Sequence, residues 1–219
     1  MQPIPIPAPV SGGLMLTYRC SAACRHCMYA CSPRWPADWM SEADVERGLA
    51  ALARYIQPSP FGPEGVSLNH GLHFTGGEPF LNYDLLLHAT RVAAEVGVPS
   101  TFVETNAFWC ASEETTREKL EALREAGLRG IMISVNPFFA EFVPFERTER
   151  AVRGSLDVFG RNVFVYQQTY WREFRSLGVR GTLSVEEYVE RTGNRQFIRR
   201  AELFLSGRAT WALRHAFPA

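Results

Sequence analysis

Apolar segments with strand character alternate with amphipathic segments of helical period along most of this chain. A period of two suits a strand and a period of 3.6 suits a helix. We predict strands at 14–19, at the start of 71–79, and at 100–107, 130–135, 162–168 and 201–206, with helices from Ser41 and at 82–97, 112–126, 145–159 and 184–193. Strands that alternate with helices at about 30-residue spacing form parallel sheets through right-handed crossovers, so the predicted fold class is α/β.

The composition is that of an ordinary globular domain. A chain of 219 residues can bury one core without splitting, so we expect an extended arm at 1–12 and a single domain at 13–219. The net charge is zero and the arginines are scattered, which predicts no nucleic-acid partner. No long apolar run or basic leader is present, so we expect no membrane partner and a cytoplasmic location.

Four of the five cysteines lie in one short segment, RCSAACRHCMYAC, at 19–31. An odd number of cysteines without a secretory signal argues against a disulfide framework and favours metal or redox chemistry. The triplet Cys20, Cys24 and Cys27 could be the buried stripe of a helix, although prolines follow soon after it. It could instead bind zinc, or hold an iron–sulfur cluster that keeps one iron open. The residues that could complete a zinc site are His26, His70, His73 and Cys110.

Polar clusters follow four of the predicted strands. They are CSAACRHC at 20–27, GGEP at 76–79, ETNA at 104–107 and SVNP at 134–137. In parallel α/β folds the groups that bind ligands lie beyond the carboxyl ends of the strands. The strand positions rest on apolar period alone, so this agreement independently supports one site at one rim of the sheet.

The spacing C-x3-C-x2-C after the first strand, followed by G-G-E-P after the second, resembles the radical S-adenosylmethionine enzymes. The similarity covers 14–168, with a weaker echo in SGRA at 206–209. It implies a partial (β/α)6 TIM-like barrel with parallel strands. It also implies that Cys20, Cys24 and Cys27 hold a [4Fe-4S] cluster whose open iron is chelated by S-adenosylmethionine. Cys31 is then not a primary ligand.

The resemblance also implies roles for residues around the cluster. Gly76 and Gly77 would let backbone carbonyls approach the ammonium group of S-adenosylmethionine, Glu78 would accept from it, and Pro79 would fix the turn. Without the cysteines, the same four residues are an ordinary strand-to-helix turn.

Further residues are expected near the nucleotide part of the cofactor. Ser134 and Asn136 resemble the ribose-binding position, and they could equally cap the next turn. Asn106 is expected near cofactor or substrate. His26 stands where many family members carry an aromatic residue, so adenine is expected either to stack less or to contact mainly backbone. The segment 162–168 also lacks the glycine-containing adenine motif. Cys110 is expected to be a lone buried thiol, with a hydrogen-donor or ligand role as the alternative.

The expected function is therefore a radical S-adenosylmethionine enzyme. By that resemblance it would cleave S-adenosylmethionine reductively and form a 5′-deoxyadenosyl radical that removes a hydrogen atom from an unknown substrate. An electron donor such as a flavodoxin or ferredoxin is implied. The alternative is a non-enzymatic zinc or iron–sulfur binding module. No catalytic residue for the substrate step is identified, no second cysteine cluster follows, and the C-terminal region of the barrel is expected to be incomplete.

Overall fold

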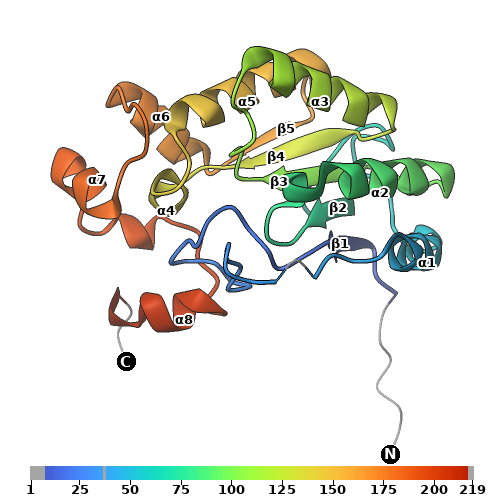
Figure 1. The fold of residues 1–219 in the computed structure, drawn as a ribbon, viewed down its shortest axis with the longest axis horizontal. Helices are drawn as coiled ribbons and strands as arrows, with labels where there is room; N and C mark the ends of the chain where they lie inside the picture. Colours follow the sequence, from blue (N-terminus) through green and yellow to red (C-terminus); the bar gives the residue numbers. More distant parts are fainter. Residues whose placement is uncertain (1–7, 37, 217–219) are drawn as a thin grey trace, which may run out of the picture.

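Five parallel strands form one sheet in the order β1-β2-β3-β4-β5 (Figure 1). The computed structural model describes residues 8–36 and 38–216. The strands are β1 (Ser11–Met15), β2 (Gly71–Thr75), β3 (Phe102–Thr105), β4 (Gly130–Ser134) and β5 (Val163–Tyr166). Because each strand pairs in parallel with its neighbour, the carboxyl ends of all five lie along one rim. The predicted α/β class is confirmed.

Helices connect the strands. They are α1 (Glu42–Ala53), α2 (Tyr83–Glu95), α3 (Glu113–Glu125), α4 (Pro137–Ala140), α5 (Phe145–Phe159), α6 (Gln168–Ser176), α7 (Val185–Thr192) and α8 (Arg208–Ala212), with short 3-10 helices at Pro79–Asn82, Phe197–Arg199 and Arg214–Ala216. Ser41 and Ser112 cap α1 and α3 by accepting from the N–H groups of Asp44 and Thr115. The five predicted helices are all present, whereas α4, α6 and α8 were not predicted.

The main core lies between one face of the sheet and helices α2, α3 and α5 (Figure 1). Period two along the strands assigns alternate residues to this face, which carries Leu72, Phe74, Val103, Ile131 and Ile133. All five of these side chains are fully buried. No helix in the part of the chain that the structure describes is long and apolar enough to cross a membrane.

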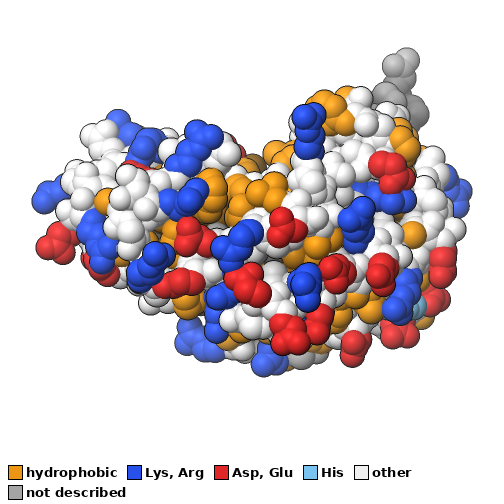
Figure 2. Space-filling model, turned by 90° about the horizontal axis from the view of Figure 1, so that it is seen from above, with side chains coloured by type: hydrophobic (Ala, Val, Ile, Leu, Met, Phe, Trp, Pro, Cys, Tyr) orange, Lys and Arg blue, Asp and Glu red, His pale blue; other side chains and the backbone are white. Residues whose placement is uncertain are grey.

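The other face of the sheet is called the inner face here. It carries His73, Thr75, Phe102, Glu104, Met132, Phe164 and Tyr166, which alternate with the core residues. Val66, Phe102 and Met132 form a separate apolar cluster on it. Viewed from above, the molecule is hollowed between the part that carries α6 and α7 and the remainder, and hydrophobic side chains show in the floor of the hollow (Figure 2).

Two of the strand predictions need correction. The first strand begins at Ser11, three residues before the predicted 14–19, because its pairing with β2 starts opposite Gly71. The sixth strand predicted at 201–206 is wrong, so the sheet has five strands in the described residues instead of the six expected for the partial (β/α)6 barrel. That segment leaves Phe204 and Leu205 exposed, and Ser206 donates to the Met28 carbonyl instead of pairing with a strand. Residues 1–7 of the predicted arm lie outside the described residues.

Candidate functional site

The cysteine loop, defined as residues 20–31, follows β1 at the carboxyl rim. Before it starts, the chain is hydrogen-bonded to the GGEP turn at 76–79. The N–H of Gly77 donates to the Thr17 carbonyl at 2.8 Å, and the N–H of Glu78 donates to the Arg19 carbonyl at 3.0 Å. The sequence predicted that the cysteine segment and the glycine turn lie close together. Two backbone hydrogen bonds join the turn to the chain that enters the cysteine loop.

The thiols of the triplet are free and largely shielded. Cys20 and Cys24 are buried, and Cys27 is half-buried. The Cys20 sulfur accepts from the N–H of Ala22 at 3.4 Å, and the Cys27 sulfur accepts from the N–H of Cys31 at 3.3 Å. Fixed N–H donors of this kind stabilise a thiolate or a metal-bound sulfur.

The three thiols differ in how readily they lose a proton. Burial raises the pKa of Cys20 to about 12, and burial also raises the pKa of Cys24 well above its usual value. A hydrogen bond from the Cys31 thiol lowers the pKa of Cys27. The same bond, together with burial, raises the pKa of Cys31. Of the three thiols, Cys27 is therefore the one whose thiolate form the protein favours most, with Cys31 as its donor.

The structure shows why positions 76 and 77 are glycine, which the sequence alone did not reveal. Gly76 has a φ of +128°, and a Cβ there would overlap the Thr17 carbonyl. A Cβ on Gly77 would overlap the Arg19 carbonyl and lie 3.0 Å from the N of Cys20. The turn therefore needs two residues without side chains in order to lie against the chain that enters the cysteine loop.

Glu78 is completely buried at the end of β2. Its carboxylate accepts from the Thr105 hydroxyl at 2.9 Å, from the N–H of Asn106 at 2.9 Å and from the N–H of Phe80 at 3.2 Å. Burial raises the pKa of Glu78 to about 7. Glu78 thus ties the carboxyl ends of β2 and β3 together, and Pro79 starts the 3-10 helix that follows.

Asn106 lies against the cysteine loop, as its position after β3 predicted. Its amide nitrogen donates to the Ser21 hydroxyl oxygen at 3.0 Å and is 3.7 Å from the Cys20 sulfur. Its amide oxygen accepts from the N–H of Phe108 at 3.0 Å. Asn106 is 4% exposed. It is therefore a second N–H donor to the first cysteine of the triplet.

Asn136 and His26 meet at the end of β4. The Asn136 oxygen accepts from the N–H groups of Phe138 and Phe139 at 3.0 and 3.2 Å, so this residue makes the cap that the sequence allowed. Its amide nitrogen is 3.2 Å from Nε2 of His26. Burial lowers the pKa of His26 to about 4, so the ring is neutral at pH 7. Its Nε2 therefore accepts the hydrogen bond that the Asn136 amide donates. Ser134 lies nearby on β4, opposite Tyr166. A ribose contact by Ser134 or Asn136 stays a prediction.

The His26 ring is enclosed by aromatic side chains. It stacks on Phe138 with centroids 4.9 Å apart and meets the edge of Phe139 at 4.8 Å. Its Nδ1 is buried and has no hydrogen-bond partner in the described residues. The ring therefore packs against the segment that follows β4.

Two arginines join the cysteine loop to later parts of the chain through contacts that the sequence did not predict. Arg25 pairs with Glu141 at 2.6 Å and with Glu186 at 3.0 Å. Arg208, in the SGRA segment, donates to three backbone carbonyls of the loop. Neither contact has a sequence signal, because the partners are separated by more than 100 positions.

Polar side chains on the inner face make contacts with one another that the sequence did not predict. The Thr75 hydroxyl donates to Glu104 at 2.6 Å, and Nε2 of His73 is 3.4 Å from the other Glu104 oxygen. The Tyr166 hydroxyl donates to Glu202 at 2.6 Å. Period two along the predicted strands would have assigned His73, Thr75 and Glu104 to one face, which is the signal that was available.

Cys110 is apart from the triplet in sequence, after β3. It is completely buried, and burial raises its pKa to about 12. Within residues 8–36 and 38–216, no three His, Cys, Asp or Glu side chains are placed to hold a single metal ion. A [4Fe-4S] cluster does not require such a placement, because each cysteine binds a different iron.

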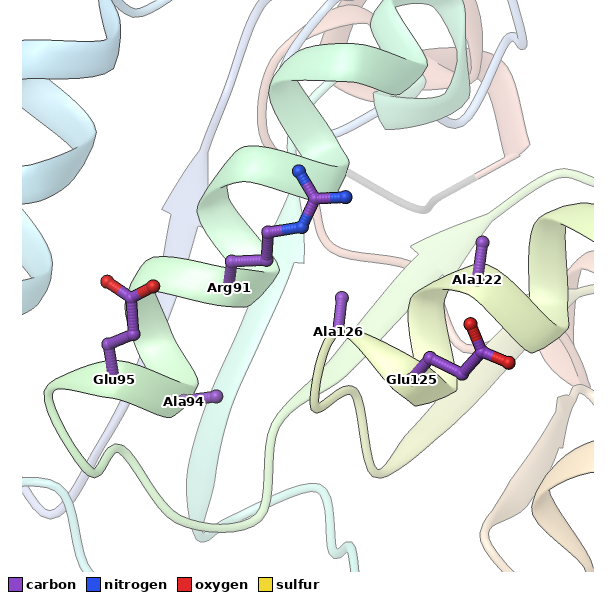
Figure 3. Close-up of a pocket in the computed structure, with 6 residues that line it drawn as sticks. All are labelled: Arg91, Ala94, Glu95, Ala122, Glu125 and Ala126. Carbon is purple, nitrogen blue, oxygen red and sulfur yellow. The ribbon is translucent and has the colours of Figure 1, made fainter.

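Two pockets lie on the surface of the described residues, and one of them includes a residue of the cysteine loop. One lies between the carboxyl ends of α2 and α3 and therefore near the amino ends of the strands, away from the cysteine loop (Figure 3). It is lined by Arg91, Ala94, Glu95, Ala122, Glu125 and Ala126. The other includes Arg25 of the cysteine loop and side chains of α4 and α7. It is lined by Arg25, Phe138, Val185, Glu186, Val189, Arg195, Phe197, Ile198, Leu213 and His215.

Comparison with known proteins gives several curated relatives. A GTP 3′,8-cyclase of Limosilactobacillus fermentum is 30% identical to this chain, over a region that covers 58% of this chain and 34% of the length of the cyclase. A GTP 3′,8-cyclase of Xanthomonas campestris pv. campestris is 32% identical over 53% and 31%. A PqqA peptide cyclase of Rhodopseudomonas palustris is 31% identical over 58% and 28%. These relatives are radical S-adenosylmethionine enzymes.

Over about half its length, this chain is a distant homologue of radical S-adenosylmethionine enzymes. The chain spans about a third of the length of the curated relatives it matches. No family model matches it.

Two solved structures are also similar. BtrN in complex with AdoMet and 2-DOIA has a TM-score of 0.47 and 17% identity, over 72% of this chain and 55% of that one. Native anSMEcpe with bound AdoMet and Cp18Cys peptide has a TM-score of 0.49 and 13% identity, over 78% and 48%.

Proposed function

We propose that this chain is a radical S-adenosylmethionine enzyme that holds a [4Fe-4S] cluster through Cys20, Cys24 and Cys27. The observation that supports this most directly is the joining of separate motifs at one rim. The cysteine loop is hydrogen-bonded to the GGEP turn through backbone groups, and Asn106 contacts the Cys20 sulfur. The distant homology to enzymes of this family supports the same conclusion.

The donor set of the loop fits an iron–sulfur cluster. Three thiols lie within eight residues, and two of their sulfurs already accept N–H hydrogen bonds from the protein. Hydrogen bonds to the sulfurs and burial are among the features by which a protein sets the potential of such a cluster. Both are present in the described residues, so the chain offers ligands and their supporting donors together.

When bound, a cluster with one open iron supplies the electron that cleaves S-adenosylmethionine to methionine and a 5′-deoxyadenosyl radical. In this proposal the residues of the chain position S-adenosylmethionine and shield it from water. Gly76 and Gly77 would present backbone carbonyls to the amino group of S-adenosylmethionine. Glu78, whose oxygens face protein donors, would hold the turn in place. Ser134 and Asn136 would face the ribose, with His26 supporting Asn136.

The inner face is the proposed place for the substrate, from which a hydrogen atom is removed. It begins at the same rim and combines aromatic rings with the Glu104 carboxylate. We further propose a cytoplasmic protein that takes its electron from a flavodoxin or ferredoxin.

Anaerobic reconstitution with iron and sulfide tests this function. We expect about four irons per chain and, after reduction in the presence of S-adenosylmethionine, release of 5′-deoxyadenosine. C24A should lose the cluster, because it removes a ligand, whereas C31A and C110A should retain it. C110A is the matched control, since it removes a buried cysteine that is outside the loop.

Two outcomes would contradict the proposal. A protein that binds one zinc tightly and releases no 5′-deoxyadenosine is the non-enzymatic module instead. Loss of the cluster in C31A with retention in C24A would show that the ligand set is wrong.

A further inference from the structure

Residues 206–208 lie on the cysteine loop although they are far from it in sequence. We call Ser206, Gly207 and Arg208 the clasp. Figure 1 shows the start of α8 beside the loop that follows β1. The Ser206 hydroxyl donates to the Met28 carbonyl at 3.2 Å, and the N–H of Arg208 donates to the Cys27 carbonyl at 2.9 Å. The loop is thus covered by backbone and side-chain contacts from the end of the domain.

The Arg208 guanidinium is the centre of these contacts. It donates to the carbonyls of Cys24 at 2.8 Å, Ala30 at 2.9 Å and Cys31 at 2.6 Å. A planar group with several fixed donors can serve three carbonyls at once, which a lysine ammonium on a flexible stem cannot do with the same geometry. One positive charge therefore orients three peptide groups of the loop.

One of these peptide groups connects Arg208 to a ligand sulfur. The peptide between Ala30 and Cys31 accepts from Arg208 through its carbonyl and donates to the Cys27 sulfur through its N–H, at 3.3 Å. Ala30 has a φ of +55°, a conformation that costs a residue with a side chain about 1–2 kcal/mol. Such a conformation persists when surrounding contacts hold it, and Arg208 supplies one of them.

Gly207 allows the clasp to lie this close. It has a φ of +55° and a ψ of −129°, and a Cβ there would overlap the Met28 carbonyl and lie 2.8 Å from the Cys27 carbonyl oxygen. Gly160 has nearly the same backbone conformation, with a φ of 59° and a ψ of −118°, but a Cβ there would have no atom within 4 Å. Alanine at either position would bear the cost of the unusual backbone conformation. Only alanine at Gly207 would also collide with the cysteine loop, so comparing the two variants isolates the effect of that collision.

We propose that Arg208 is a positioning residue for the cofactor site: it holds the Ala30–Cys31 peptide so that its N–H faces the Cys27 sulfur, and it places a fixed positive charge beside the cluster ligands. The second part rests on the proposed function. The first part concerns the loop alone and can be tested without iron.

The first test is alkylation of the iron-free protein by iodoacetamide without oxygen, with Cys24 followed by mass spectrometry. Cys24 is buried, so it reacts when the loop opens. R208Q should react about tenfold faster or more, since it loses charge-assisted hydrogen bonds. R199Q is the control, because Arg199 is exposed and makes no hydrogen bond or ion pair of its side chain within the described residues. G207A should act like R208Q, and G160A should not.

A second substitution tests whether Arg208 acts by holding the Ala30–Cys31 peptide. Glycine adopts a positive φ without steric strain, so A30G should return the R208Q rate toward that of the parent. R208K keeps the charge but not the three-carbonyl geometry, so its rate should lie between those of the parent and R208Q. Equal Cys24 rates in R208Q and R199Q, or no rescue by A30G, would overturn the positioning role.

The second test is the midpoint potential of the reconstituted cluster. Removing a nearby positive charge disfavours the more negative reduced state, so R208Q should have a lower potential than the parent, with R208K closer to the parent. An unchanged potential in R208Q that retains its cluster would overturn the electrostatic part. If the parent binds no iron, the proposed function fails, and the alkylation result still decides the role of Arg208 in the loop.

Discussion

At the scale of single residues, the site is built around a buried carboxylate close to thiols. Glu78 is completely buried, and its charge is the second cause, after burial, of the raised pKa of Cys20. Its three hydrogen-bond donors favour the charged form, but burial outweighs them and raises the pKa of Glu78 to about 7. The carboxyl group therefore changes its charge near neutral pH, where an ordinary glutamate does not.

This raised pKa predicts a pH dependence of stability for the iron-free protein. Between its usual value of 4.5 and about 7, Glu78 keeps a proton in the folded state that it has lost in the unfolded state. The contribution to the free energy of unfolding is fully present below pH 4.5 and decreases by about 3 kcal/mol as pH rises through 7. Urea unfolding of the parent and E78Q across this range measures it as the difference between the two.

The control for that measurement is E95Q, which removes an exposed carboxyl at the end of α2. The parent and E95Q should keep a constant difference across the same range. A difference between the parent and E78Q that is flat or increases with pH would show that Glu78 is charged throughout.

The sequence predicted which residues meet at the carboxyl rim better than it predicted the contacts they make there; their binding roles stay predictions. The spacing of Cys20, Cys24 and Cys27 and the position of Asn106 were sufficient to bring them to one rim. The reason for Gly77 was not predictable, because it depends on the Arg19 carbonyl, which is distant in sequence. Whether Asn136 also contacts a ribose is still a prediction.

At the scale of elements, the GGEP turn and the segment before Cys20 act as one unit. Two backbone hydrogen bonds join them, and both glycines of the turn lie where no side chain fits. The turn continues β2 and the segment continues β1, so the pairing of two strands extends into the site. A change in either segment should therefore move the other.

Substituting Gly77 with alanine tests this coupling. A Cβ at Gly77 would overlap backbone, which cannot rotate away as a side chain can, so we expect G77A to lower the free energy of unfolding by at least about 2 kcal/mol. It should also reduce iron incorporation, because it displaces the chain that enters the cysteine loop. G48A is the control, since a Cβ at Gly48 in α1 would make only an ordinary contact of 3.9 Å with Leu14. Equal stability of G77A and G48A would contradict the coupling.

Helices and strands were predictable where the local pattern agreed with the fold. The capping serines Ser41 and Ser112 marked two helix starts correctly. Helix α6 was missed because its N-cap residue, Gln167, makes no side-chain cap hydrogen bond, whereas the shorter α7 is capped by Ser184. The position of α6 depends instead on distant contacts, such as the hydrogen bond from the Tyr170 hydroxyl to the Phe197 carbonyl at 2.8 Å. The apolar run at 201–206 resembled a strand, but it has no neighbouring strand to pair with and crosses to the cysteine loop instead.

At the scale of the whole molecule, the beginning and the end of the described chain meet at the cysteine loop. The loop follows the first strand, and the clasp at 206–208 precedes α8. The intervening sheet has β1 at one edge and β5 at the other, so the clasp links regions that the strand order keeps apart. Ligand binding at the loop should therefore change how tightly residues 206–208 are held.

Reciprocity makes this consequence quantitative. If docking of the clasp favours the conformation of the loop that binds a cluster, then cluster binding must favour docking of the clasp by the same factor. Trypsin cleavage after Arg208 reports undocking, because its side chain is held by the loop carbonyls while docked. The reconstituted protein should be cleaved there more slowly than the iron-free protein, and C24A should show no such protection. Cleavage after the exposed Arg54 at the end of α1 is the internal control. Equal cleavage after Arg208 with and without the cluster would mean that the clasp and the ligands are energetically independent.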